Sequence, residues 1–105
     1  MLSEKVRRVT IYVNEADEWQ GKPVHLEILR FLQQQGCAGG TVLRGVAGFT
    51  KAAGVVTTSL VDAGGKLPLV IEYIDSPDAV ERVLPKLREF AGKRLITVED
   101  LELYP

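Results

Sequence analysis

The chain has 105 residues, of which 46% are hydrophobic and 26% are charged, and its formal net charge is −1. These values are typical of a single globular domain, residues 1–105, and they give no electrostatic reason to expect nucleic-acid binding. No apolar run approaches the roughly 18 residues of a membrane span, so we expect no direct membrane insertion. Cys37 is the only cysteine, which excludes an intrachain disulfide and favours a cytoplasmic location.

The first half of the chain predicts a strand, a helix and a second strand. Apolar residues alternate over residues 6–13, which is the period-two pattern of a strand with one buried face. Residues 15–21 are polar and indicate a loop. Pro23 suits the first position of a helix, apolar residues follow at helical spacing, and Gly36 is placed to end that helix. The β-branched residues within 41–46 predict the second strand.

The second half predicts another strand, helix and strand after a long connection. Residues 47–66 give no single pattern, and a loop of this length in a small domain indicates a functional segment. Residues 67–75 are apolar on both faces apart from Glu72, which predicts a strand. Ser76, Pro77 and an acidic residue form a helix start. A last strand begins at Ile96 and either continues or turns before Leu101.

The predicted order is β-α-β, a long loop, then β-α-β. With right-handed crossovers, this order predicts an α+β ferredoxin-like plait, with two helices on one face of a four-stranded antiparallel sheet. The apolar residues on the other face need a partner. A sheet-to-sheet homo-oligomer is the simplest one.

The strongest candidate for a binding site is the stretch over residues 36–54, GCAGGTVLRGVAGFTKAAG. Glycine-spaced backbone can approach a phosphate and present N–H groups to it. Simpler explanations stay open. The glycines are also typical of turns, Arg44 could form an ion pair between subunits, and the Lys51 side chain could simply be hydrated. Lys93 and Arg94 follow a helix end, where cations complement the helix dipole without any ligand.

The same stretch resembles PII-like signalling proteins, and more closely a compact PII-like branch that reads G-x-x-G-x-T-V-x-R-G-x-x-G-F-G. The matching residues are Gly36, Gly39, Thr41, Val42, Arg44, Gly45, Gly48 and Phe49. The resemblance also covers the first strand, LPLVIEYID and residues 92–99. One departure is Thr50, which replaces the last glycine of the motif. Another is the absence of a loop tyrosine, which some PII proteins use for nucleotidylation.

The resemblance implies a non-enzymatic homotrimer with no tightly bound cofactor. It implies that AMP, ADP, ATP or cyclic AMP binds between subunits, where the base of loop 47–66 meets a glycine-lysine turn of the neighbour. It also implies that this loop regulates a membrane transporter or channel, or a metabolic enzyme. The implied binding residues are Gly39, Gly40, Thr41, Arg44, Gly48, Phe49, Lys51, Gly92, Lys93 and Arg94.

Two other functions stay open. Small plaits include cofactor-free enzymes, which need a positioned base. His25 and Glu72 are the candidates, but no Ser/His/Asp or Cys/His pairing is present, so we expect no catalytic residue. A metal-handling trimer would resemble the copper-tolerance proteins, but one cysteine and one histidine give no Cys/His cluster and we expect no metal site. Modification of Thr57, Thr58 or Ser59 is also left open.

Overall fold

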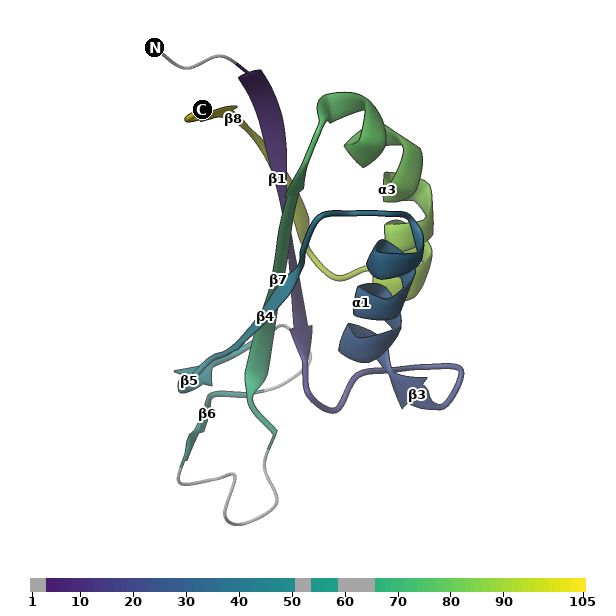
Figure 1. The fold of residues 1–105 in the computed structure, drawn as a ribbon. Coiled ribbons are helices and arrows are strands. Elements are labelled where there is room, and N and C mark those ends of the chain that lie inside the picture. Colours follow the sequence, from purple (N-terminus) through teal and green to yellow (C-terminus); the bar gives the residue numbers. More distant parts are fainter. Residues whose placement is uncertain (1–3, 51–53, 59–65) are drawn as a thin grey trace.

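A computed structural model describes residues 4–50, 54–58 and 66–105, and it confirms the predicted plait (Figure 1). One four-stranded sheet has the order β4-β7-β1-β8, and all neighbouring strands are antiparallel. Its strands are β1 (Glu4–Asn14), β4 (Thr41–Arg44), β7 (Pro68–Asp75) and β8 (Ile96–Leu103). The helices α1 (Val24–Gln34) and α3 (Pro77–Ala91) lie on one face of this sheet.

The core lies between the sheet and the two helices because alternate strand residues point the same way. As predicted, Val9, Ile11 and Val13 share the face of β1 toward the helices, and each is at most 2% exposed. Full burial of a side chain of this size stabilises the fold by about 1.5–3 kcal/mol. The helices contribute the buried residues Val24, Ile28, Leu32, Val80, Val83, Leu87, Phe90 and Ala91.

The ends of α3 have the geometry that its sequence predicts. The Ser76 hydroxyl accepts a hydrogen bond from the Ala79 N–H at 3.3 Å, and Pro77 occupies the first turn, where its missing N–H costs nothing. At the other end, Gly92 has a φ of +63° and its N–H donates to the Arg88 carbonyl at 2.9 Å. A positive φ of this kind favours glycine, so Gly92 is a structural stop for the helix.

The segment before α1 differs from the prediction of a plain loop over residues 15–21. β2 (Glu18–Trp19) pairs with β3 (Lys22–Pro23), and the turn between them has a positive φ at Gln20 and Gly21. The helix begins at Val24, so Pro23 immediately precedes it rather than occupying its first position. A ladder of two residues per strand is too short for hydrophobic periodicity to reveal.

The long connection contains ordered structure that the sequence patterns left undecided. β4 ends at Arg44 rather than at Val46, and the chain continues into β5 (Ala47–Gly48), which pairs with β6 (Val56–Thr57). The Thr58 N–H donates to the Val46 carbonyl at 3.1 Å. Lys51 and Ser59 lie outside the described residues.

Both helices lie on one face of the sheet, so the other face is left without helices (Figure 1). Strand alternation places Tyr12, Leu43 and Ile74 there, with exposed fractions of 44%, 53% and 42%. Arg8 and Glu99 form an ion pair on the same face. Within the described residues, neither helix is long and apolar enough to cross a bilayer.

Candidate functional site

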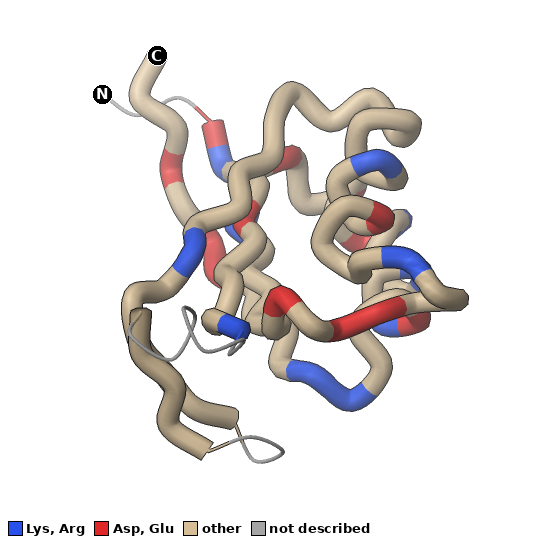
Figure 2. Tube along the Cα trace, turned by 90° about the horizontal axis from the view of Figure 1, so that it is seen from below, with Lys and Arg blue, Asp and Glu red and all other residues tan. Residues whose placement is uncertain are grey.

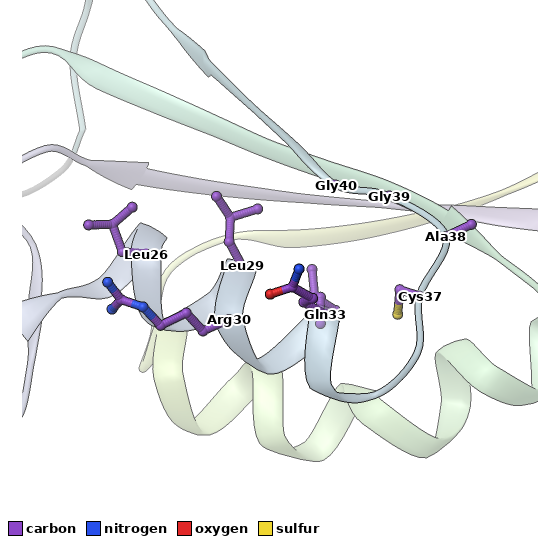
Figure 3. Close-up of a pocket in the computed structure, with 9 residues that line it drawn as sticks. Leu26, Leu29, Arg30, Gln33, Cys37, Ala38, Gly39 and Gly40 are labelled. Carbon is purple, nitrogen blue, oxygen red and sulfur yellow. The ribbon is translucent and has the colours of Figure 1, made fainter.

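The glycine-rich stretch begins beside α1 and forms one wall of a groove of about 330 Å³. The helix α1 forms the opposite wall. From it, Leu29 and Gln33 point toward the Gly39–Gly40 backbone, and Arg30 lies beside them on the helix (Figure 3). A Cβ on Gly39 would meet nothing within 4 Å, whereas a Cβ on Gly40 would lie 3.4 Å from the Leu29 Cδ2. Gly39 therefore leaves room for a ligand, and Gly40 chiefly permits close packing.

Cys37 lines the same groove, but its sulfur points away from the two glycines (Figure 3). Burial raises the pKa of the Cys37 thiol, and the carboxylate of Asp75 beside it raises that pKa further. A thiol held in its neutral form is a poor nucleophile. Cys37 is partly buried and packs against the hydrophobic core, where it forms part of the groove wall.

Arg44 lies at the end of β4 and is paired within its own chain. Its Nε donates to the Glu15 Oε1 at 2.8 Å, and the same oxygen accepts the Leu67 N–H at 3.0 Å. The Glu15 N–H in turn donates to the Leu67 carbonyl at 3.0 Å. The hydrogen bond from Arg44 holds the pKa of the Glu15 carboxyl below its ordinary value, although partial burial opposes it.

Gly45 and Gly48 pack against Pro68, the first residue of β7. A Cβ on Gly45 or Gly48 would lie 2.9 Å or 2.8 Å from the Pro68 Cγ, which is closer than packed carbon atoms approach. The Gly45 N–H also donates to the Pro68 carbonyl at 2.8 Å. Gly48 therefore permits a close backbone approach in the fold itself. Phe49, the next residue, is 75% exposed.

Arg94 follows α3, and its guanidinium donates hydrogen bonds to several acceptors. Its Nε and Nη2 donate to the two carboxylate oxygens of Asp17 at 2.6 Å and 2.7 Å, and its Nη1 donates to the Ala91 carbonyl at 3.2 Å. The Asn14 N–H donates to the same Asp17 carboxylate at 2.7 Å. Arg88 reaches the Gly92 and Arg94 carbonyls at 2.7 Å each, which fixes the turn that carries the exposed Lys93.

The 14–17 loop connects these two groups. β1 and β4 end, and β7 and β8 begin, at the same end of the antiparallel sheet. Glu15 and Asp17 therefore reach Arg44 on one side and Arg94 on the other. Figure 2 views the molecule from this end, where acidic and basic stretches alternate.

The sequence interpretation missed these two acids because it treated this part of the chain as a plain polar loop. Their position in the sequence could have indicated a role. They directly follow a central strand, and their spacing of two residues lets them face Arg44 on one side and Arg94 on the other. Trp19 anchors the segment that follows them. Its ring lies 4.8 Å from the Phe90 ring in an edge-to-face contact, and the Lys86 Nζ lies 5.2 Å from the Trp19 ring.

A model of the DUF190 family, described as an uncharacterized ACR, matches residues 6–103. The chain belongs to the DUF190 family. The UPF0166 protein of Methanocaldococcus jannaschii is 32% identical over 101 residues, which cover 95% of this chain and 93% of that protein. A UPF0166 protein of Aquifex aeolicus is also 32% identical over 101 residues, covering 94% and 93% of the two chains.

Solved structures show where this DUF190 chain stands among known folds. CPII, a nitrogen regulatory PII-like protein from Thiomonas intermedia K12, superposes with a TM-score of 0.69 at 17% identity, over 94% of this chain and 88% of CPII. That CPII structure is bound to ADP, AMP and bicarbonate. A second, bound to ADP and bicarbonate, gives a TM-score of 0.67 at 18% identity over the same shares. The PII-like fold that the sequence motif predicted is therefore confirmed.

The residues of the competing enzyme hypothesis do not meet in this DUF190 fold. His25 is a half-buried residue of α1, on the helix-covered face of the sheet. Glu72 alternates with the buried Ile71 and Tyr73 of β7, so it points to the opposite face. No group of three or more His, Cys, Asp or Glu residues within the described part of the chain is arranged to hold a metal ion.

Proposed function

We propose that this DUF190 chain is a cytoplasmic PII-like regulator, rather than an enzyme, that binds an adenine nucleotide between subunits. One observation carries the proposal: the base of the long connection and the turn at Gly92 lie at one end of the sheet, joined through the 14–17 loop. CPII, which shares this fold, is bound to ADP and AMP. The proposal transfers adenine-nucleotide binding from CPII to this chain.

The proposed site uses side chains that face solvent on the single subunit. Phe49 offers an exposed aromatic surface for the base, and Arg44 and Lys93 offer positive charge for phosphate groups. Arg94 and Gly48 shape the site, because their contacts are made within the chain. The remaining proposed contacts are Gly39, Gly40, Thr41, Lys51 and Gly92.

The proposed assembly is a homotrimer that packs through the sheet face carrying Tyr12, Leu43 and Ile74. Apolar side chains exposed over a continuous face mark an interaction surface. Near the base of the long connection, Val46 and Val55 are also well exposed, at 74% and 67%. We propose that segment 47–66 contacts the regulated partner, a membrane transporter or channel or a metabolic enzyme.

Calorimetric titration of ATP, ADP, AMP and cyclic AMP, with light scattering on the same sample, tests the proposal. We expect micromolar binding of one nucleotide per chain and the mass of three chains. Arg44→Ala should weaken ADP binding about tenfold, because a charge-assisted contact to phosphate is lost. Arg82→Ala removes an exposed arginine of α3 and is the matched control. An intact trimer that binds none of the four nucleotides would refute the proposal.

A further inference from the structure

Arg44 and Arg94 are held by acids of the same short loop, but in different ways. Arg94 uses three of its nitrogens on Asp17 and the Ala91 carbonyl. The ion pair of Arg44 with Glu15 uses one nitrogen, Nε, and its side chain is 53% exposed. A guanidinium has five N–H donors. A competing anion can therefore replace the partner of Arg44 by breaking one hydrogen bond, whereas at Arg94 it would have to break a bidentate pair.

Glu15 has a second partner that does not depend on Arg44. Its Oε1 accepts the Leu67 N–H at 3.0 Å, and its own backbone N–H donates to the Leu67 carbonyl. The Glu15 side chain is 23% exposed, so part of it remains hydrated. If Arg44 turned to a ligand, the carboxylate would keep its backbone partner and water. Loss of the ion pair therefore does not leave a buried charge without a partner.

We infer that Glu15 is a specificity-determining residue: it occupies on Arg44 the place of an anionic ligand group, and it thereby weakens the binding of charged ligands but not that of uncharged ones. The inference rests on the proposed function and concerns the same site. A carboxylate and a phosphate both accept hydrogen bonds from a guanidinium, so they compete for Arg44. A ligand must outcompete Glu15 to gain this contact. The phosphates of ADP compete with Glu15 for Arg44, whereas uncharged adenosine has no group that does.

The variant Glu15→Gln tests this competition. The glutamine carbonyl oxygen can still accept the Leu67 N–H, so the local fold is kept while the competing charge is removed. We expect ADP to bind roughly five- to thirtyfold more tightly, since a charge-assisted pair no longer has to be broken. Adenosine affinity should change less than about twofold. Glu18→Gln is the matched control, because Glu18 is an exposed acid three residues along the chain.

Two further outcomes separate this inference from the proposed function. Unchanged or weaker ADP binding by Glu15→Gln, with wild-type binding intact, overturns the inference and leaves the function standing. Absence of nucleotide binding by both proteins refutes the function.

In that case, NMR of the Arg44 Nε–H during titration with inorganic phosphate decides the inference. A shift at lower phosphate concentration in Glu15→Gln than in wild type supports it, and equal responses overturn it. Circular dichroism and the Leu67 amide signal verify that the variant is folded.

Discussion

Replacing the partners of the Asp17–Arg94 ion pair should destabilise the fold measurably. Asp17 accepts three hydrogen bonds, from the Arg94 Nε and Nη2 and from the Asn14 N–H, at 2.6–2.7 Å. The pair joins the loop after β1 to the turn after α3. It is also only partly exposed, with side-chain fractions of 39% for Arg94 and 18% for Asp17. A bidentate contact with this burial is expected to exceed an ordinary surface ion pair in strength.

The magnitude follows from the type of bond and its exposure. Hydrogen bonds to charged groups contribute about 1.5–3 kcal/mol each when well buried, whereas exposed ion pairs contribute about 0.2–1 kcal/mol. Since Arg94 is more than a third exposed, we discount the buried value and expect a coupling of about 1–2 kcal/mol. In a domain of this size, each kcal/mol lowers the melting temperature by about 4–8 °C.

A double-mutant cycle measures this coupling directly. The free energy of unfolding is determined in urea for wild type, Asp17→Ala, Arg94→Ala and the double variant, at one protein concentration because assembly affects apparent stability. Glu18→Ala is the control and should change stability by less than about 0.5 kcal/mol. If the two single effects add to within about 0.3 kcal/mol, the pair does not hold the turn and the reasoning is wrong.

Two other predictions concern the base of the long connection. Gly48→Ala should cost about 1–3 kcal/mol in urea denaturation, because its Cβ would lie 2.8 Å from the Pro68 Cγ, whereas Gly39→Ala, which meets open space, should be near neutral. The second concerns pH. Arg44 lowers the pKa of Glu15 in the folded chain, so this ion pair stabilises the fold above roughly pH 5 and the effect is lost as pH falls below roughly 4. The stability difference between wild type and Glu15→Gln should therefore shrink on acidification, and a constant difference would contradict the assignment.

The sheet and both helices could be predicted because each buries one regular face. Alternation at Val9, Ile11 and Val13 and the helical stripe of α3 reflect the two periods that burial imposes on a chain. The last strand, β8, continues to Leu103, which the sequence had left open. The β2–β3 and β5–β6 ladders could not be predicted, because two-residue pairings bury too little for a pattern to form.

The glycines of the candidate site show a second limit of prediction from sequence. The motif made Gly39, Gly40 and Gly48 equal candidates for contact with a phosphate. In the fold, a side chain at Gly48 would collide with Pro68, a side chain at Gly40 would touch Leu29, and Gly39 alone of the three borders open space. A glycine in a sequence indicates that a side chain is excluded, but the identity of the excluding group depends on segments far along the chain.

The two arginines of the site show the same limit most clearly. In the sequence, Arg44 is a cation within a predicted strand, and Arg94 is a cation that follows a predicted helix. Arg44 finds its partner Glu15 29 residues away, and Arg94 finds Asp17 77 residues away. Among the described residues, Arg44 uses one nitrogen and Arg94 uses three, and this difference follows from how the 14–17 loop meets each side of the sheet. The more weakly held Arg44 is thus the better candidate for a ligand contact, and this difference depends on the topology that brings distant acids together.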